Sequence, residues 1–299
     1  IRFSYQNGYR FPSLFEGFTN INSGGVKRVG GLPIMSNGIY ENAYLVTSIN
    51  AFQTAITADV NTNGLTTSQA IQKNKGLLKK SPYTYLKPEQ VNSFEIGYKG
   101  LFAGQRLFVD VDAYYMTYKN FIAQVNANLA KGSNPDSLAY YFSSANTQDR
   151  YRLWTNSQTK VFNYGASLGL RYSLTTNWSI GGNASFARLD RAENGDGLES
   201  AFNTPQWITN LNLSNGNVWN GLGFSVNYKY QSSFLWQSEL ATGNVPAINT
   251  LDGQISYRLP TPGVLVKVGG TNLFNKPYYT FIGGPSVAGF YYTNLVWEM

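Results

Sequence analysis

Several residue types and patterns on which whole classes of protein depend are missing from this sequence. It has no cysteine, which excludes disulfides, iron–sulfur clusters and thiolate zinc sites. It has no histidine, the commonest general base and metal ligand. No run of about 20 apolar residues is present, so no helix is expected to span a membrane. We therefore expect no catalytic residue, no metal site and no cofactor, and we do not expect an enzyme.

Charge is also scarce, whereas aromatic side chains are abundant. Charged residues make up 13% of the chain, about half the share typical of a soluble domain. Aromatic residues make up 15%, yet the mean hydropathy is only -0.26. Such a composition is typical of a wall with one apolar and one polar face. The net charge of +7 is spread along the sequence, so contact with anionic lipid head groups is expected, and a nucleic-acid partner is not.

Apolar and polar residues alternate with a period of two over much of the chain, as in strands whose two faces meet different surroundings. From Leu107 to Tyr115 the odd-numbered positions are apolar or aromatic, whereas the even-numbered positions include Asp110 and Asp112. Most of these segments have roughly the length of a tilted membrane crossing. We predict ten such strands, at residues 1–9, 90–101, 105–118, 161–174, 177–190, 205–214, 220–231, 247–259, 264–272 and 289–298.

The predicted connections alternate between short and long. The short turns cover residues 102–104, 175–176, 215–219 and 260–263. The long connections cover residues 10–89, 119–160, 191–204, 232–246 and 273–288, and the region 43–71 is expected to be partly helical. Outer-membrane barrels have short periplasmic turns and long extracellular loops. The alternation of short and long connections therefore favours a barrel over a soluble sandwich.

The hairpin around Phe102 supports the interpretation that one face of the sheet is apolar and the other polar. If Gly100 pairs with Gln105, apolar side chains of the two strands meet on one face and charged ones on the other. Because hydrocarbon offers no hydrogen-bond partner to backbone groups, such a sheet must close, alone or with strands outside this chain. The predicted fold is an all-β, transmembrane antiparallel β-barrel. The chain opens inside a strand at Ile1, so we expect an N-terminal part with any secretion signal to precede it.

Three segments resemble motifs of TonB-dependent outer-membrane receptors. Gly8–Glu16 resembles the family segment GFRAPSLxEL, Leu86–Lys99 resembles LKPExxxxxELGxK, and Gly269–Tyr278 resembles xNLFDKxY. They occur in the family's order and at compatible spacing, and the resemblance to the C-terminal half of these receptors covers essentially the whole chain. The style of the sequence resembles the Bacteroidota branch of the family.

The resemblance implies a barrel of about 22 strands, of which residues 1–299 form about the last ten as a single domain. It implies an N-terminal plug domain and coupling to TonB with ExbB and ExbD through that missing part. Outer-membrane lipid and lipopolysaccharide are further expected partners, as is a SusD-like surface lipoprotein. The implied function is TonB-coupled uptake of a nutrient, such as an iron chelate, a vitamin, a glycan or a peptide, at the outer membrane of a Gram-negative bacterium.

Two sets of residues are candidates for functional roles. The first set consists of aromatic side chains in the long loops: Tyr140, Tyr141, Phe234, Trp236, Tyr278 and Tyr279. They could bind a polar solute, and packing between loops is an equally good interpretation. Charged residues on the polar face of the strands are expected to face the lumen and contact the plug, rather than to form a catalytic cluster: Glu95, Lys99, Asp110, Asp112 and Arg171.

Other functions stay open on the sequence alone. A passive porin or a structural barrel of a larger surface or secretion complex would show the same alternation. A soluble β-sheet binding module, such as a lectin, would need no membrane. An outer-membrane protease is the most remote alternative, because it would need a histidine.

Overall fold

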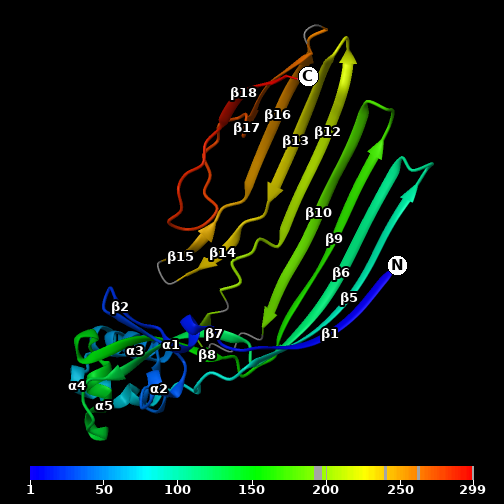
Figure 1. Ribbon diagram of the computed structural model, residues 1–299. Coiled ribbons are helices and arrows are strands. Elements are labelled where there is room, and N and C mark those ends of the chain that lie inside the picture. Colours follow the sequence, from blue (N-terminus) through cyan, green and yellow to red (C-terminus); the bar gives the residue numbers. More distant parts are fainter. Residues whose placement is uncertain (192–196, 200, 239–240, 261–262, 298–299) are drawn as a thin grey trace.

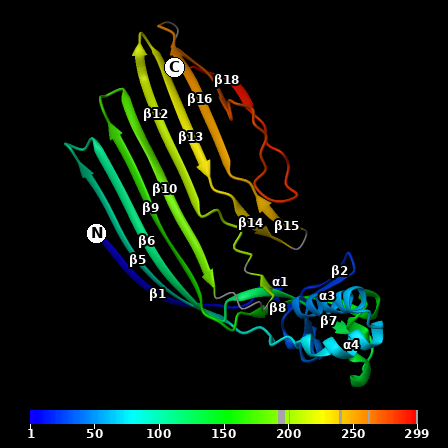
Figure 2. The same ribbon diagram turned by 180° about the vertical axis from the view of Figure 1, so that it is seen from behind.

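The main feature of the computed structural model is a ten-stranded antiparallel sheet (Figures 1 and 2). The structure describes residues 1–191, 197–199, 201–238, 241–260 and 263–297. In order across the sheet, the strands are β1 (Arg2–Arg10), β5 (Glu89–Phe102), β6 (Leu107–Lys119), β9 (Val161–Ser173), β10 (Trp178–Arg191), β12 (Trp207–Trp219), β13 (Leu222–Gln231), β16 (Ile248–Arg258), β17 (Val264–Thr271) and β18 (Phe290–Trp297).

All ten predicted strands are present, and most of their ends agree to within two or three residues. The largest departure is in β12, because residues 215–219 do not form the predicted turn. The strand continues past a register irregularity to Trp219, and the chain reverses at Asn220 and Gly221. Both residues have positive φ, 43° and 84°, a conformation that asparagine and glycine adopt most readily.

The predicted register of the β5–β6 hairpin is wrong by four residues. Gly100 pairs with Val109 rather than with Gln105. The reversal takes up the whole segment 103–106, with positive φ at Ala103, Gly104 and Gln105, so the first residue of β6 is Leu107. A shift by an even number leaves every side chain on its predicted face, and the separation of apolar from charged residues is retained.

The sheet has two chemically different faces. Cross-strand pairs such as Ile96 with Ala113 and Val111 with Leu168 lie on one face, and Asp112 with Ser167 on the other. Aromatic rings line the apolar face toward the long connections, where Phe186 lies 6.2 Å from Tyr164 and 4.9 Å from Trp207. Three tryptophans lie at the opposite end, near the short turns: Trp178, Trp219 and Trp297. This is the arrangement of a membrane-facing wall with interfacial aromatic belts.

The long connections all leave the sheet at one end (Figure 1). Two of them, 11–88 and 120–160, fold together with β11 (Leu198–Glu199) into a structure that we call the apical body. Its strands form a second sheet in the order β11, β7 (Ile122–Ala130), β8 (Gln148–Asn156), β3 (Val26–Val29) and β2 (Asn20–Ser23), with β4 (Tyr44–Leu45) paired to β7. The sequence pattern does not predict this second sheet.

Helices complete the apical body, and a hairpin lies beside it. The helices are α1 (Leu14–Phe18), α2 (Pro33–Ser36), η1 (Tyr40–Asn42), α3 (Val46–Asn63), α4 (Thr67–Asn74), η2 (Lys75–Leu77), η3 (Pro135–Ser137), α5 (Leu138–Phe142) and η4 (Ala145–Thr147). The hairpin consists of β14 (Phe234–Gln237) and β15 (Thr242–Val245). No helix within the described residues is both long and apolar enough to cross a membrane.

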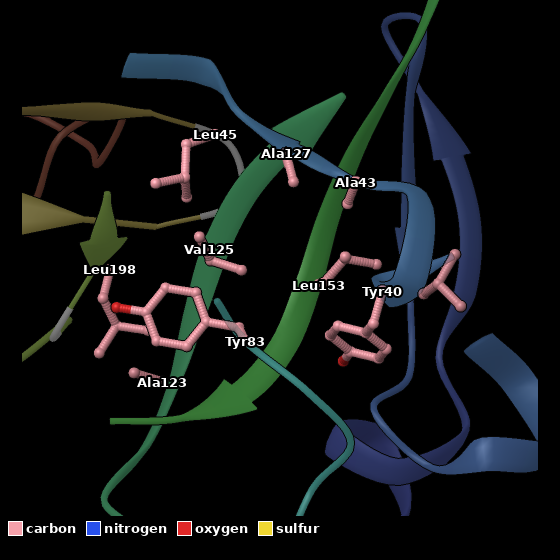
Figure 3. Packing of buried hydrophobic residues seen from close by; sticks show 10 residues of the cluster. Tyr40, Ala43, Leu45, Tyr83, Ala123, Val125, Ala127, Leu153 and Leu198 are labelled. Atoms are coloured by element: carbon pink, nitrogen blue, oxygen red, sulfur yellow. The ribbon is translucent and has the colours of Figure 1, made fainter. Parts of the chain in front are cut away.

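The apical body has a hydrophobic core of its own, in two clusters. One lies on the apolar face of the second sheet, where Val125, Ala127 and Leu153 meet Tyr40 and Tyr83 (Figure 3). The other joins α3, α4 and α5 through buried side chains that include Ile49, Phe52, Ile71 and Phe142. These long connections are therefore a packed structure rather than loose loops.

Candidate functional site: the lumenal wall and the apical body

The polar face of the main sheet carries a lattice of charges that begins at Arg2. One guanidinium nitrogen of Arg2 lies 2.6 Å from Glu95 and 2.5 Å from Asp112. Lys99 pairs with Asp110 at 3.1 Å. All five residues predicted to face the lumen lie on this face, because Arg171 is paired across the strands with Phe108, on the same face as Asp110 and Asp112.

A shallow groove of about 520 Å³ crosses the same face between β6 and β13. Gly169 and Gly181 keep its floor low, because neither carries a side chain that would fill it. Amides line one side, and Asn210 donates a hydrogen bond of 2.9 Å to Asn183. At the other side the Arg171 guanidinium lies 5.6 Å from the centre of the Phe108 ring. The wall therefore presents both charges and amide hydrogen-bonding groups to whatever fills the space beside it.

Two of the family-like segments meet where the main sheet joins the apical body. Arg10 lies at the end of β1, and its guanidinium forms ion pairs with the carboxylates of Glu16 at 2.9 Å and Glu89 at 3.4 Å. Glu89 also accepts a hydrogen bond of 2.8 Å from the backbone N–H of Ile122. Burial alone would raise the pKa of Glu16, but hydrogen bonds from Ser13 and Arg10 outweigh it and lower that pKa. The acidic and basic residues of these segments thus fix the first long connection to the strand ends.

The third family-like segment shapes the chain reversal after β17. Asn272 and Asn275 both have positive φ, 48° and 49°. The Asn272 side chain donates to the Lys276 carbonyl at 2.9 Å, and that of Asn275 accepts from the Gly289 N–H at 2.8 Å. The two asparagines close the last connection by replacing backbone hydrogen bonds with side-chain ones.

The six loop aromatics fall into two separate groups. Tyr140 and Tyr141 lie on α5 in the apical body, and the Tyr140 hydroxyl is 2.8 Å from that of Ser68. Trp236, on β14, packs against Phe281 at 5.5 Å. Phe234 shares that hairpin, and a small hollow of about 240 Å³ beside Lys276 is lined by Tyr278 and Tyr279. Whether either group contacts a solute stays a prediction.

The apical body contains a polar cavity that the sequence pattern does not predict. It measures about 450 Å³ and lies between the first turns of α3 and the polar face of the second sheet. Asn126, Asn128, Gln148 and Arg150 line it from β7 and β8. A signal is present in 122–130, where apolar residues alternate with amides, but this short segment falls within a predicted long connection.

A buried carboxylate joins the two helices α3 and α4. Asp59 accepts hydrogen bonds from Lys73 at 2.6 Å, Asn74 at 2.7 Å and Asn63 at 2.6 Å. The bond from Lys73, followed by those from the two asparagines, lowers the pKa of Asp59 from 3.8 to about 2. Three side chains are therefore held together by a single negative charge.

This arrangement gives a prediction for acid stability. A carboxylate with a lowered pKa in the folded state stabilises the fold above its unfolded pKa, and that stabilisation is lost as pH falls toward 2. We expect protease resistance of the apical body to decline between about pH 4 and pH 2 in the wild type. The variant Asp59→Asn should be less resistant at pH 7 and should lack this step. Limited proteolysis measures both, with a neutral protease at pH 7 and an acid-active protease between pH 4 and pH 2. An identical pH profile in the variant would contradict the assignment.

Comparisons with known proteins agree with this fold. A family model described as TonB dependent receptor-like, beta-barrel, matches residues 1–273. The protein belongs to this family of outer-membrane proteins of Gram-negative bacteria. A search of curated protein sequences found no match.

Two solved structures of similar fold match with the same TM-score. The FpvAI–pyocin S2 complex matches with a TM-score of 0.50 and 16% identity, over 70% of this chain and 28% of that chain. The pyoverdine outer membrane receptor FpvA from Pseudomonas aeruginosa PAO1, bound to pyoverdine, matches with a TM-score of 0.50 and 17% identity, over 72% and 31%. This protein thus spans less than a third of each of those chains, and at this identity the likeness concerns the fold alone.

Proposed function

We propose that the intact protein is an active importer that takes up a nutrient across the outer membrane in a TonB-coupled manner. The observation that carries the proposal is the family match over residues 1–273, together with a sheet that has an apolar outer face and a charged inner face. The solute classes that suit this proposal are iron chelates, vitamins, glycans and peptides. FpvA, whose fold is similar, is bound to pyoverdine in its structure.

The main sheet forms part of the barrel wall in this proposal. Its edge strands β1 and β18 do not pair with each other, so the described residues leave the sheet open. Exposed backbone groups at those edges would be unsatisfied in hydrocarbon. We propose that strands outside residues 1–299 close the barrel, and that this chain is its C-terminal portion.

A plug domain and the energy-coupling partners complete the proposed machine. The charge lattice of Arg2, Glu95 and Asp112 gives a plug several ion-pairing positions on the lumenal wall. TonB, with ExbB and ExbD, would act on the plug to open a path. Membership of a receptor family favours import over a passive porin, and none of the comparisons supports a SusD-like lipoprotein, so we do not propose one.

The proposal can be tested before the solute is identified. Spent medium would be compared by mass spectrometry for the parent organism, a strain lacking the gene for this protein and a strain lacking TonB. We expect at least one solute to stay in the medium in both mutants and to disappear with the parent. If a solute that requires this protein is still consumed without TonB, the proposal is wrong.

A further inference from the structure

The 450 Å³ cavity of the apical body has no role in the wall or in the contacts described above. Its size lies within the range of small-molecule sites. The floor is the polar face of the second sheet, and the wall is the first part of α3, from Val46 to Gln53. Both elements are anchored by the two hydrophobic clusters, so the cavity is held in shape by packed structure.

Within the part of the chain that the structure describes, one positive charge on the cavity, that of the exposed Arg150, has no acidic partner. Arg150 lies directly across from Asn128 on the neighbouring strand, and both line the cavity. Among the described residues, the Arg150 side chain makes no ion pair or hydrogen bond, and no aspartate or glutamate lines the cavity. The neighbouring charges are already paired, since Asp149 lies 3.4 Å from Lys27 and Arg152 lies 2.5 Å from Glu199. Arg150 is therefore available to a ligand.

Two buried amides line the cavity together with this charge. Asn128 and Gln148 are 8% and 6% exposed, and Asn128 donates to Gln148 at 2.7 Å. Gln148 in turn donates to the Ser144 carbonyl at 2.9 Å, and Gln53 donates to the Phe142 carbonyl at 2.8 Å. These bonds fix the orientation of the amides but use only part of their hydrogen-bonding capacity, since each amide has two N–H donors and a carbonyl acceptor. The remaining groups suit ligand hydroxyls.

The surroundings add to the positive potential. The first turn of α3 lines the cavity at Val46 and Ile49, has no acidic residue and has no side-chain cap at Leu45. The positive end of a long helix dipole therefore adjoins the cavity. The apical body, counted over residues 11–88, 120–160 and 198–199, contains eleven lysines and arginines against six aspartates and glutamates, so its net positive charge attracts anions.

We infer that this cavity binds a small polyhydroxylated carboxylate, such as a sugar acid. The planar guanidinium of Arg150 matches a carboxylate with two parallel hydrogen bonds. The amides of Asn50, Gln53 and Asn128 match the hydroxyls. The inference deepens the proposed uptake function, on which its biological meaning rests, because it names a class of solute that the apical body captures.

Binding by the purified full-length receptor in detergent micelles tests the inference. Glucuronate is the probe, with glucose as the uncharged analogue and inorganic phosphate as the competing anion, measured by isothermal titration calorimetry at neutral pH. We expect the wild type to bind glucuronate at least tenfold more tightly than glucose or phosphate. Arg150→Gln should weaken glucuronate binding at least tenfold. Asn50→Asp should also weaken glucuronate binding, because the new negative charge repels the ligand carboxylate.

Lys75→Gln is the matched control, because it removes the same charge from the apical body on η2, outside the cavity. Its affinity for glucuronate should equal that of the wild type. Absence of glucuronate binding, or equal binding by Arg150→Gln and wild type, overturns the inference. Phosphate binding as tight as glucuronate binding also overturns it, because it would identify a general anion site of the kind that takes lipopolysaccharide phosphates. The assay contains no TonB, so its result is independent of the uptake experiment.

Discussion

Replacing Leu168 by arginine is expected to destabilise the barrel in a bilayer by about 2–4 kcal/mol. Leu168 lies near the middle of β9, between Val111 of β6 and Ala184 of β10, on the apolar face of the sheet. A charged side chain there must lie in hydrocarbon or distort the membrane around it, and its cost is greatest at the midplane. The measurement is the folding free energy of the intact protein in lipid vesicles, followed by denaturant titration and the heat-modifiable shift on gel electrophoresis.

Ser167→Arg is the matched control for this variant. Ser167 is the neighbouring residue on the same strand but lies on the opposite face, directly across from Asp112. An arginine there meets water and a carboxylate, so a change of less than about 1 kcal/mol is expected. Equal destabilisation by the two variants would mean that the two faces do not meet different solvents, and the barrel assignment would be wrong.

Phe52→Ala is expected to unfold the apical body while the barrel stays folded. Phe52 is completely buried, at 0% exposed, in the cluster that joins α3, α4 and α5. Removing a buried phenylalanine side chain costs about 3–5 kcal/mol, and this core is too small to absorb such a loss. We expect limited proteolysis to cleave within 46–77 in the variant, whereas the wild type is resistant there.

Two measurements distinguish local unfolding from general loss of structure. Heat-modifiability should be unchanged in Phe52→Ala, because the main sheet has its own hydrogen bonds and its own apolar face. Ile34→Ala, at a position that is 80% exposed, should leave protease resistance at the wild-type level. If Phe52→Ala abolishes heat-modifiability as well, the apical body and the barrel fold as one unit and the prediction fails.

The strands of the main sheet were predictable because each contains its own signal. A strand that separates oil from water must alternate, and the alternation is visible in the local sequence whatever the strand pairs with. The register of the β5–β6 hairpin was harder to predict from the sequence. A shift of four residues leaves every side chain on the same face of the sheet, so the apolar side chains stay on the apolar face in either register. Only the conformation of Ala103, Gly104 and Gln105 fixed it.

The apical body was harder to predict because its sheet is assembled from distant segments. β3 pairs in parallel with β8, more than a hundred residues further along the chain, and β4 pairs with β7. Strands as short as β3 and β4 have little periodicity of their own. Their stability comes from packing between the two long connections, which no local window of sequence contains.

By itself, the sequence determined the two-faced wall, the ends of most of its strands, the alternation of long and short connections and the family. Each of these depends on which residues are neighbours along the chain. The tertiary structure alone decided that Arg10 joins Glu16 to Glu89, that the loop aromatics form two groups, and that Arg150 lines a cavity together with two buried amides beneath α3. Those contacts depend on long-range pairing and on packing across the apical body, so they exist only once the chain has folded.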